Sequence, residues 1–228
     1  LDCLNGIRSP REDALRLVKT GSADELEAFF AQEGGEVSST VLSAAVELAP
    51  SLPAAQLENI VRAMLRSGGG NSKDPTPMGL FSVFWSTLER LFRALGKEVT
   101  SRLMVEETRG RSFLELIPLA AFINGQELSY ARLAGDVEKP DEQLITLESL
   151  LEVERNIVSS LRDADIKPTD LEDSGARMLL YLWSCFDSES YDRLVTNGVL
   201  RDPLGYALHA MHYLGTFATG TNHGWSLS

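Results

Sequence analysis

The sequence predicts an all-α fold, an irregular multi-helix array or bundle of antiparallel helix pairs, with a solenoid-like stack as the alternative arrangement. Apolar residues recur at intervals of three and four, helix-start patterns precede them, and no segment alternates strongly with period two. The 228 residues are 43% hydrophobic and 24% charged, which is ordinary for a globular chain. A chain of this length can bury a substantial core.

Helix starts recur as serine, threonine or aspartate followed by glutamate three residues later, or directly by proline. The cap side chain accepts from the third amide, and the glutamate accepts from the cap residue's own amide. Proline suits the first helical position because the missing N–H has no helical partner there. We therefore expect helices to begin after Ser9, Ser22, Ser112, Thr169 and Asp202.

Helix ends are predicted where glycine, alone or after asparagine, can adopt the left-handed conformation that closes a helix. These positions are Gly21, Gly34–Gly35, Asn124–Gly125 and Asn197–Gly198.

Four apolar stripes with helical spacing each predict a helix that buries one face. Burying one leucine contributes about 1.5–3 kcal/mol, against a net stability of about 5–15 kcal/mol for a domain. The stripes comprise Leu57, Ile60, Val61, Met64 and Leu65; Phe81, Phe84, Trp85, Leu88, Leu91, Phe92 and Leu95; Leu147, Leu150, Leu151, Ile157, Val158 and Leu161; and Leu204, Ala207, Leu208, Met211 and Leu214.

Two further segments lack a clear one-sided stripe. Met178–Trp183 is apolar on nearly every side, so we place it at the centre of the C-terminal bundle. A buried strand is the alternative, but the Thr169 capping pattern upstream favours a helix. Val37–Ser43, rich in serine, threonine and valine, has the weakest helical pattern.

Glycine and proline indicate the domain organisation. Ser67–Pro77 holds three glycines and two prolines, which cannot sustain a helix. We predict an N-terminal subdomain of about four helices over residues 1–66, a linker over 67–79 and a C-terminal bundle over 80–228. Gly135–Glu142 is interpreted as a hinge or surface loop, and no clean internal repeat emerges.

The charge pattern bears on partners. The net charge is −12, and Asp136–Asp173 alone holds twelve acidic and four basic residues. An acidic domain repels phosphate backbones, so we expect no nucleic-acid partner. We interpret the mildly basic stretch Arg90–Arg111 as a solvated helix face, and docking of a basic partner on the acidic stretch stays open as an alternative.

Compartment signals favour the cytoplasm. Apolar stretches such as Leu116–Ile123 fall short of the ~20 residues that a membrane span needs, and no signal peptide is visible. Cys3 and Cys185 fit two free thiols better than a disulfide framework. Because the chain begins at Leu1 rather than methionine, we expect it to belong to a longer product.

Phosphate and calcium motifs fail on inspection. A phosphate-binding loop needs GxxxxGK[ST] after a strand, whereas Gly68–Gly70 is followed by Asn71-Ser72-Lys73 without the second glycine. A calcium loop starting at Asp163 would place Lys167 and Pro168 at a ligand position and at the glycine position. We therefore interpret both segments as connections between helices.

Metal and catalytic residues are equally sparse. His209 and His212 lie three apart on one predicted helix and are weak metal candidates, because zinc needs three or four converging ligands. A hydrogen-bonded structural histidine is the ordinary expectation. Glu154, inside the third stripe and beside Arg155, could be a partly buried general acid, an ion-paired residue or an edge residue. We assign no catalytic, cofactor-binding or metal residue, and predict no cofactor.

Residues 80–219 resemble the helical region that follows the ATPase core in KAP-family P-loop NTPases. The resemblance is carried by Leu88-Glu89-Arg90-Leu91, Val99–Glu107, Ser112–Leu116 with Ala120–Phe122, Leu182-Trp183, Leu194–Leu200 and Leu208–Phe217. It implies an accessory helical domain that regulates, senses for or assembles an upstream ATPase. The family's Walker lysine and acidic metal ligand have no counterpart here, so no functional residue is carried over.

We therefore expect a non-catalytic helical domain of a larger intracellular protein, working with a protein partner or an upstream domain of the same chain. The alternative is a helical bundle that binds a small molecule or carries an unrecognised enzymatic site, near the aromatic residues of Phe81–Trp85 or Met178–Phe186. A partner-helix groove on one of the stripes is also open. The sequence assigns no oligomeric state.

Overall fold

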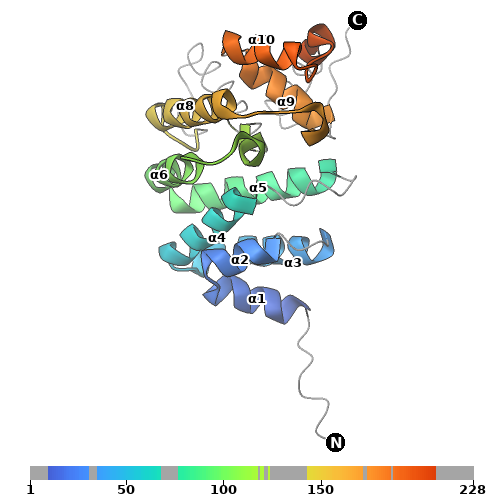
Figure 1. Cartoon of the computed structure of the whole chain (residues 1–228). Helices are drawn as coiled ribbons and strands as arrows, with labels where there is room; N and C mark the ends of the chain where they lie inside the picture. Colours follow the sequence, from blue (N-terminus) through green and yellow to red (C-terminus); the bar gives the residue numbers. More distant parts are fainter. Residues whose placement is uncertain are drawn as a thin grey trace, which may run out of the picture. The chain divides into compact units, whose positions relative to one another are not determined.

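The computed structural model describes residues 10–30, 35–67, 77–117, 119–120, 123, 143–171, 174–185 and 187–208. In these ranges all regular structure is helical and no strand is present, which confirms the all-α prediction (Figure 1). Several predicted features lie outside the described residues: Ser9, Gly34, Gly68–Gly70, Asn124–Gly125, Gly135–Glu142, His209 and His212.

The chain forms two compact units, Leu1–Leu103 and Met104–Ser228. The division falls inside helix α6 (Lys97–Thr108) rather than at the glycine-rich segment where the sequence placed it. The physical reason is that α5 (Pro77–Leu95), which follows that segment, packs on α3 and α4 of the first unit.

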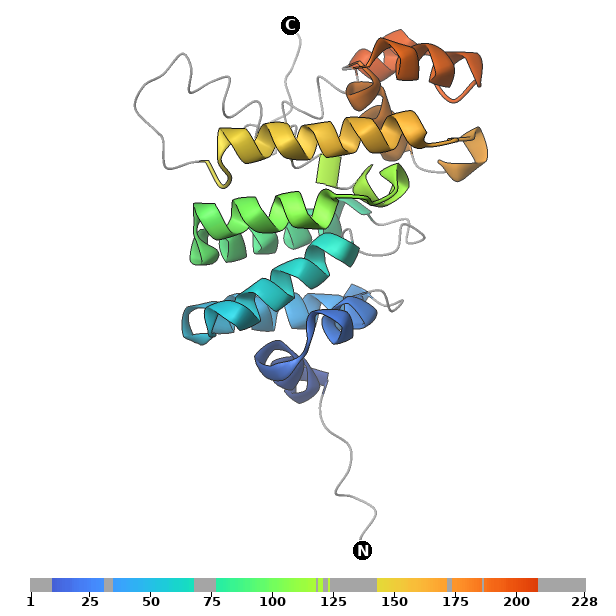
Figure 2. The same ribbon diagram turned by 60° about the vertical axis from the view of Figure 1, so that its left-hand side comes forward.

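In the first unit, helices two apart in the chain pack on each other. The helices are α1 (Pro10–Thr20), α2 (Ala23–Phe30), α3 (Gly35–Leu48), the single turn η1 (Ala49–Ser51), α4 (Ala54–Ser67) and α5. α1 packs on α3, α3 on α5, and α2 on α4 (Figure 2). This is the packing order of helix-pair solenoids. Val37–Ser43 lies inside α3 and is helical.

The junction of α1, α2 and α4 is fixed by local hydrogen bonds. The Ser22 amide donates to Glu25 Oε2 over 2.8 Å and the Glu25 amide to Ser22 Oγ over 3.2 Å, which confirms the predicted capping box. Gln56 Nε2 donates to the carbonyls of Val18 and Gly21, at 3.0 and 2.9 Å. The free carbonyls at the end of α1 are thus satisfied by a side chain of α4.

Gly21 does not adopt the predicted left-handed conformation; Gly96, Gly110 and Gly198 are the positive-φ residues of the described chain. Instead, the Gly21 amide donates to the Leu17 carbonyl over 2.7 Å. A Cβ at Gly21 would lie 2.5 Å from that carbonyl oxygen. Glycine is required here for close backbone approach.

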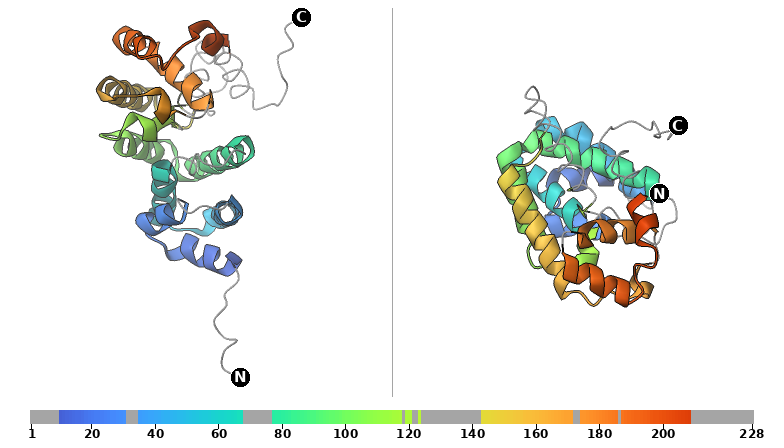
Figure 3. Two further views of the ribbon diagram at one scale, coloured as in Figure 1. Left: turned by 45° about the vertical axis from the view of Figure 1, so that its right-hand side comes forward. Right: turned by 90° about the horizontal axis from the view of Figure 1, so that it is seen from above.

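The second unit contains helical residues 113–117, α8 (Leu147–Asp163), the single turn η3 (Pro168–Asp170), α9 (Ser174–Ser184), α10 (Ser188–Thr196) and helical residues 203–208. α8, α9 and α10 pack against one another (Figure 3). Met178–Trp183 is helical, and Leu180 and Trp183 in it have no exposed surface, as its apolar character predicted.

Three of the predicted boundaries in this unit are confirmed and one is wrong. A helix begins after Ser112, whose amide donates to Glu115 Oε2 over 3.3 Å. Asp202 Oδ1 accepts from the Gly205 amide over 3.0 Å, and Gly198 closes α10 with φ of 72°. Thr169, however, does not begin a long helix. The Asp170 carboxylate accepts from the Lys167 amide over 2.8 Å, which closes a single turn, so α9 starts only at Ser174.

The third stripe, and the described part of the fourth, include residues that are not buried. The buried face of α8 is Leu150, Val153, Ile157 and Leu161. Leu147 and Leu151, which were predicted to be buried with this stripe, lie beside that face and are 52% and 46% exposed. Leu204 and Leu208 are also exposed, at 71% and 55%.

Candidate functional site

The first unit carries an open hollow beside α3 and α5. Its larger part has a volume of about 570 Å³, and an adjoining part of about 350 Å³ shares Val46 and Arg90 with it. We call the two parts together the α3–α5 hollow. Its lining residues are Ser43, Val46, Glu47, Ala49, Pro50, Leu52, Ala54, Leu57, Ser86, Thr87, Arg90, Ala94, Leu95 and Val99.

Helical spacing brings these side chains to one side of each helix. Thr87, Arg90 and Ala94 are three and four residues apart on α5, so they share a face. On α3, Val46 and Glu47 lie one turn beyond Ser43 in the same way. Small alanines and the η1 turn leave the space between these faces unfilled. The hollow is thus produced by short side chains where α3 ends.

Arg90 differs from other arginines of the unit in its electrostatics. Arg93 pairs with Glu89 over 2.9 Å and Arg102 with Glu58 over 2.8 Å. Glu47, the acid that lines the hollow, pairs with Arg11 over 3.4 Å. Within the described ranges no ion pair or hydrogen bond joins Arg90 to another residue. Its guanidinium therefore leaves an uncompensated positive charge in the hollow.

Thr87 adds a polar group to the hollow wall. The residue is only 4% exposed, and no hydrogen bond joins its hydroxyl to another described residue. In the larger part of the hollow, Val46, Leu52, Leu95 and Val99 are half-buried, so some of their apolar surface remains open to solvent. The hollow therefore combines a cation, a hydroxyl donor and apolar walls.

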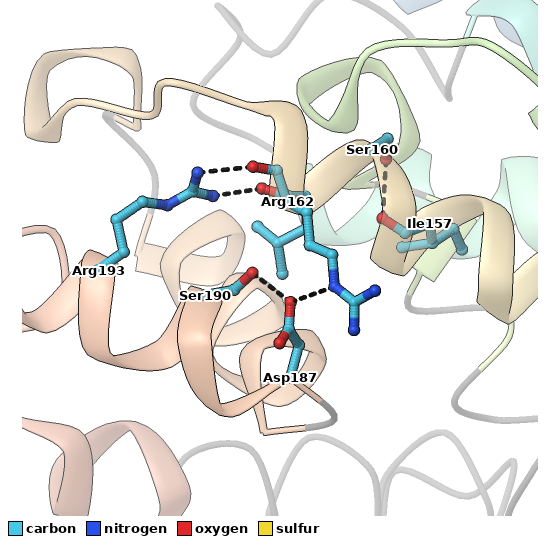
Figure 4. A network of polar contacts seen from close by, with 7 residues as sticks. Ile157, Ser160, Arg162, Asp187, Ser190 and Arg193 are labelled. Atoms are coloured by element: carbon cyan, nitrogen blue, oxygen red, sulfur yellow. Dashed lines mark hydrogen bonds and ion pairs between the residues drawn. The ribbon is translucent and has the colours of Figure 1, made fainter.

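The second unit contains a polar network that links α8 to α10 (Figure 4). The buried Asp187 carboxylate accepts from Arg162 Nε over 2.8 Å and from Ser190 Oγ over 2.6 Å. The Ser190 hydroxyl, and then Arg162, hold the pKa of Asp187 below its usual range. Arg193 donates to the carbonyls of Leu161 and Arg162, over 2.5 and 2.6 Å. Each charge here has a partner, so the network fastens two helices and offers no free acid or base.

Glu154 is half-buried, as one of the interpretations required. Burial raises the pKa of its carboxyl, against the opposing effect of the Arg155 charge. Among the described residues Glu154 forms no ion pair with its neighbour Arg155, whose Nη1 pairs instead with Glu152 Oε2 over 2.8 Å. Among the described residues no hydrogen bond places a second catalytic group beside Glu154. A lone carboxyl group does not make an acid–base site.

The described residues offer neither a metal site nor a membrane-spanning helix. In the part of the chain that the structure describes, no group of three histidine, cysteine or carboxylate side chains could hold a metal ion. The same residues contain no helix whose length and hydropathy would allow it to cross a bilayer. His209 and His212 lie beyond Leu208, where the description ends.

Comparisons of the chain with protein-family models, with curated proteins and with solved structures find no match. The functional assignment therefore has to rest on the residues themselves. Sequence reasoning placed Arg90 on a solvated helix face, and the residue is exposed. The sequence did not show that Arg90 lines a hollow. Arg93 has Glu89 four residues before it on the same helix and pairs with it, whereas Arg90 has no acidic residue three or four positions away.

Proposed function

We propose that this chain is a non-catalytic helical domain that acts through protein–protein contacts in a larger cytoplasmic protein or assembly. The observation that carries the proposal is the α3–α5 hollow, an open surface with apolar walls and an unpaired guanidinium. Helices stacked two apart present such extended surfaces in many binding proteins. The exposed, free thiol of Cys185 supports the cytoplasmic part of the proposal.

We further propose that the domain regulates or assembles a P-loop NTPase, which lies upstream in the same product or is a separate protein. Only the resemblance of residues 80–219 supports that step. The test is to isolate the native protein from its own cell, measure its mass and sequence peptides upstream of Leu1. A strand followed by GxxxxGK[ST] in the same product, or an NTPase bound to it, would support the step. A native product near 25.0 kDa without an NTPase would remove it.

The interaction function itself is tested by cross-linking mass spectrometry on the native protein at its cellular concentration. We expect cross-links from Lys97, close in sequence to the hollow residue Val99, to another protein or to another domain of the same product. A protein that elutes as an isolated domain and gives only internal cross-links would contradict the interaction role.

The small-molecule alternative centred on Met178–Phe186 gains little support. Trp183 has no exposed surface, and neither part of the α3–α5 hollow is lined by a residue of α9. The acidic stretch also offers a basic partner fewer free carboxylates than its composition suggests. Glu152 is already paired with Arg155, and Lys167 lies 3.9 Å from Asp165.

A further inference from the structure

We infer that the α3–α5 hollow binds an acidic, amphipathic segment of a partner protein. A carboxylate of that segment pairs with Arg90, while its apolar side chains cover the half-buried aliphatic residues of the hollow wall. The inference rests on the proposed interaction function and deepens it by naming the surface and the chemistry of the partner.

The charge balance points to an acidic partner. The chain carries a net charge of −12, so most of its surface repels a carboxylate. The hollow is an exception, because Glu47 is neutralised by Arg11 and Arg90 has no described partner. A guanidinium presents paired N–H donors that match the two oxygens of a carboxylate. The positive charge of Arg90 therefore favours an acidic group at the hollow.

The apolar lining of the α3–α5 hollow indicates that the partner's carboxylate belongs to a segment that also carries apolar side chains. Val46, Leu52, Leu95 and Val99 are each half-buried and surround a space of about 570 Å³. This volume has room for more than one apolar side chain. A segment with carboxylates on one side and aliphatic residues on the other covers both the walls and the cation at once.

The openness of the hollow favours a peptide segment over an enclosed small molecule. Pockets for small ligands commonly bury most of the ligand surface. Here the rim residues Pro50, Ala54, Arg90 and Ala94 are exposed, so the hollow is shallow on that side. The Thr87 hydroxyl, in a residue 4% exposed, provides a donor in the lining of the smaller part.

The test uses the full chain and a phage-displayed library of random sixteen-residue peptides, with affinities of recovered peptides measured by fluorescence anisotropy. The variants are Arg90→Glu, the cavity-filling Ala94→Trp, and Arg93→Glu as the matched control on the same helix. We expect recovered peptides to be enriched in aspartate and glutamate together with leucine, isoleucine or phenylalanine. Arg90→Glu should weaken their binding roughly tenfold or more, Ala94→Trp should weaken it as well, and Arg93→Glu should leave it within about twofold. Circular dichroism verifies that each variant is folded.

Three outcomes would overturn the inference: recovery of no peptide above background, recovered peptides without acidic enrichment, or equal binding by Arg90→Glu and the unmodified chain. Saturable, Arg90-dependent binding of decanoate with no peptide binding would instead assign the hollow to a small carboxylate. Failure here leaves the interaction function standing if native cross-links to another protein are found elsewhere on the chain, so the two failures are distinguishable.

Discussion

Replacing Asp187 with alanine should destabilise the second unit, because this carboxylate joins α10 to the end of α8. The Asp187 side chain is 6% exposed and accepts two hydrogen bonds, from Ser190 and from Arg162. The bond from Ser190 is buried and has a charged acceptor, which contributes about 1.5–3 kcal/mol. The Arg162 side chain is 60% exposed, so solvent screens its ion pair and the pair adds little.

The expected loss in the free energy of unfolding is therefore about 1.5–3 kcal/mol, nearly all of it from the Ser190 bond. The substitution also leaves the buried Ser190 hydroxyl, in a residue 2% exposed, without its acceptor, which makes the loss larger. The matched control is Asp192→Ala, an exposed aspartate on the same helix, which should cost less than about 0.5 kcal/mol.

The assay is urea unfolding at pH 7 followed by tryptophan fluorescence. Trp85 and Trp225 are first replaced by phenylalanine, so that Trp183 in α9 reports on the second unit alone. The transition reported by Trp183 is fitted as that of the second unit by itself, because two compact units need not unfold together. A loss below about 0.5 kcal/mol for Asp187→Ala, or an equal loss for Asp192→Ala, would refute the reasoning.

The pH dependence of the same variant gives an independent check. The pKa of Asp187 is lowered in the folded state, so the folded state prefers the ionised carboxylate. Its contribution is fully present above the unfolded pKa of about 3.9 and is lost as the pH falls through the folded value. The difference between the unmodified chain and Asp187→Ala should therefore be constant from pH 7 to pH 5 and shrink below pH 4. A difference that grows on acidification would contradict this assignment.

Three further changes test the local structure. Gly21→Ala places a Cβ 2.5 Å from the Leu17 carbonyl oxygen and should lower the unfolding free energy by about 1–3 kcal/mol; no loss in a urea titration would disprove the close contact. Gln56→Ala removes two hydrogen bonds to the end of α1 and should cost about 1–2 kcal/mol, whereas its neighbour Ala55, which is exposed, should tolerate serine. Glu154→Gln should raise the urea midpoint at pH 7, because burial raises the pKa of Glu154 and the folded state therefore disfavours the charged carboxylate. The gain should vanish at pH 3.5, where the carboxyl is protonated in both the folded and the unfolded state. A gain that persists at pH 3.5 would rule out the titration of Glu154 as its cause.

Local helix boundaries followed from the sequence where the interaction is complete within four residues. The capping box of Ser22 and Glu25 and the cap at Asp202 needed no distant partner, and both are present. The boundary at Thr169 failed because a competing local bond, from the Lys167 amide to Asp170, closes a single turn first. Two neighbouring patterns of similar strength cannot be ranked from residue types alone.

Burial and the candidate site depended on partners distant in the chain. The sequence by itself determined that the chain is α-helical, since apolar spacing and capping residues act within one or two turns. Tertiary structure decided which residues of each stripe are covered, leaving Leu147 and Leu151 exposed while Val153 is buried. It also decided that Arg102 of α6 meets Glu58 of α4, and that Arg90 lines a hollow beside α3. The physical reason is that exposure and charge pairing depend on which helices pack together, and helical periodicity does not encode that choice.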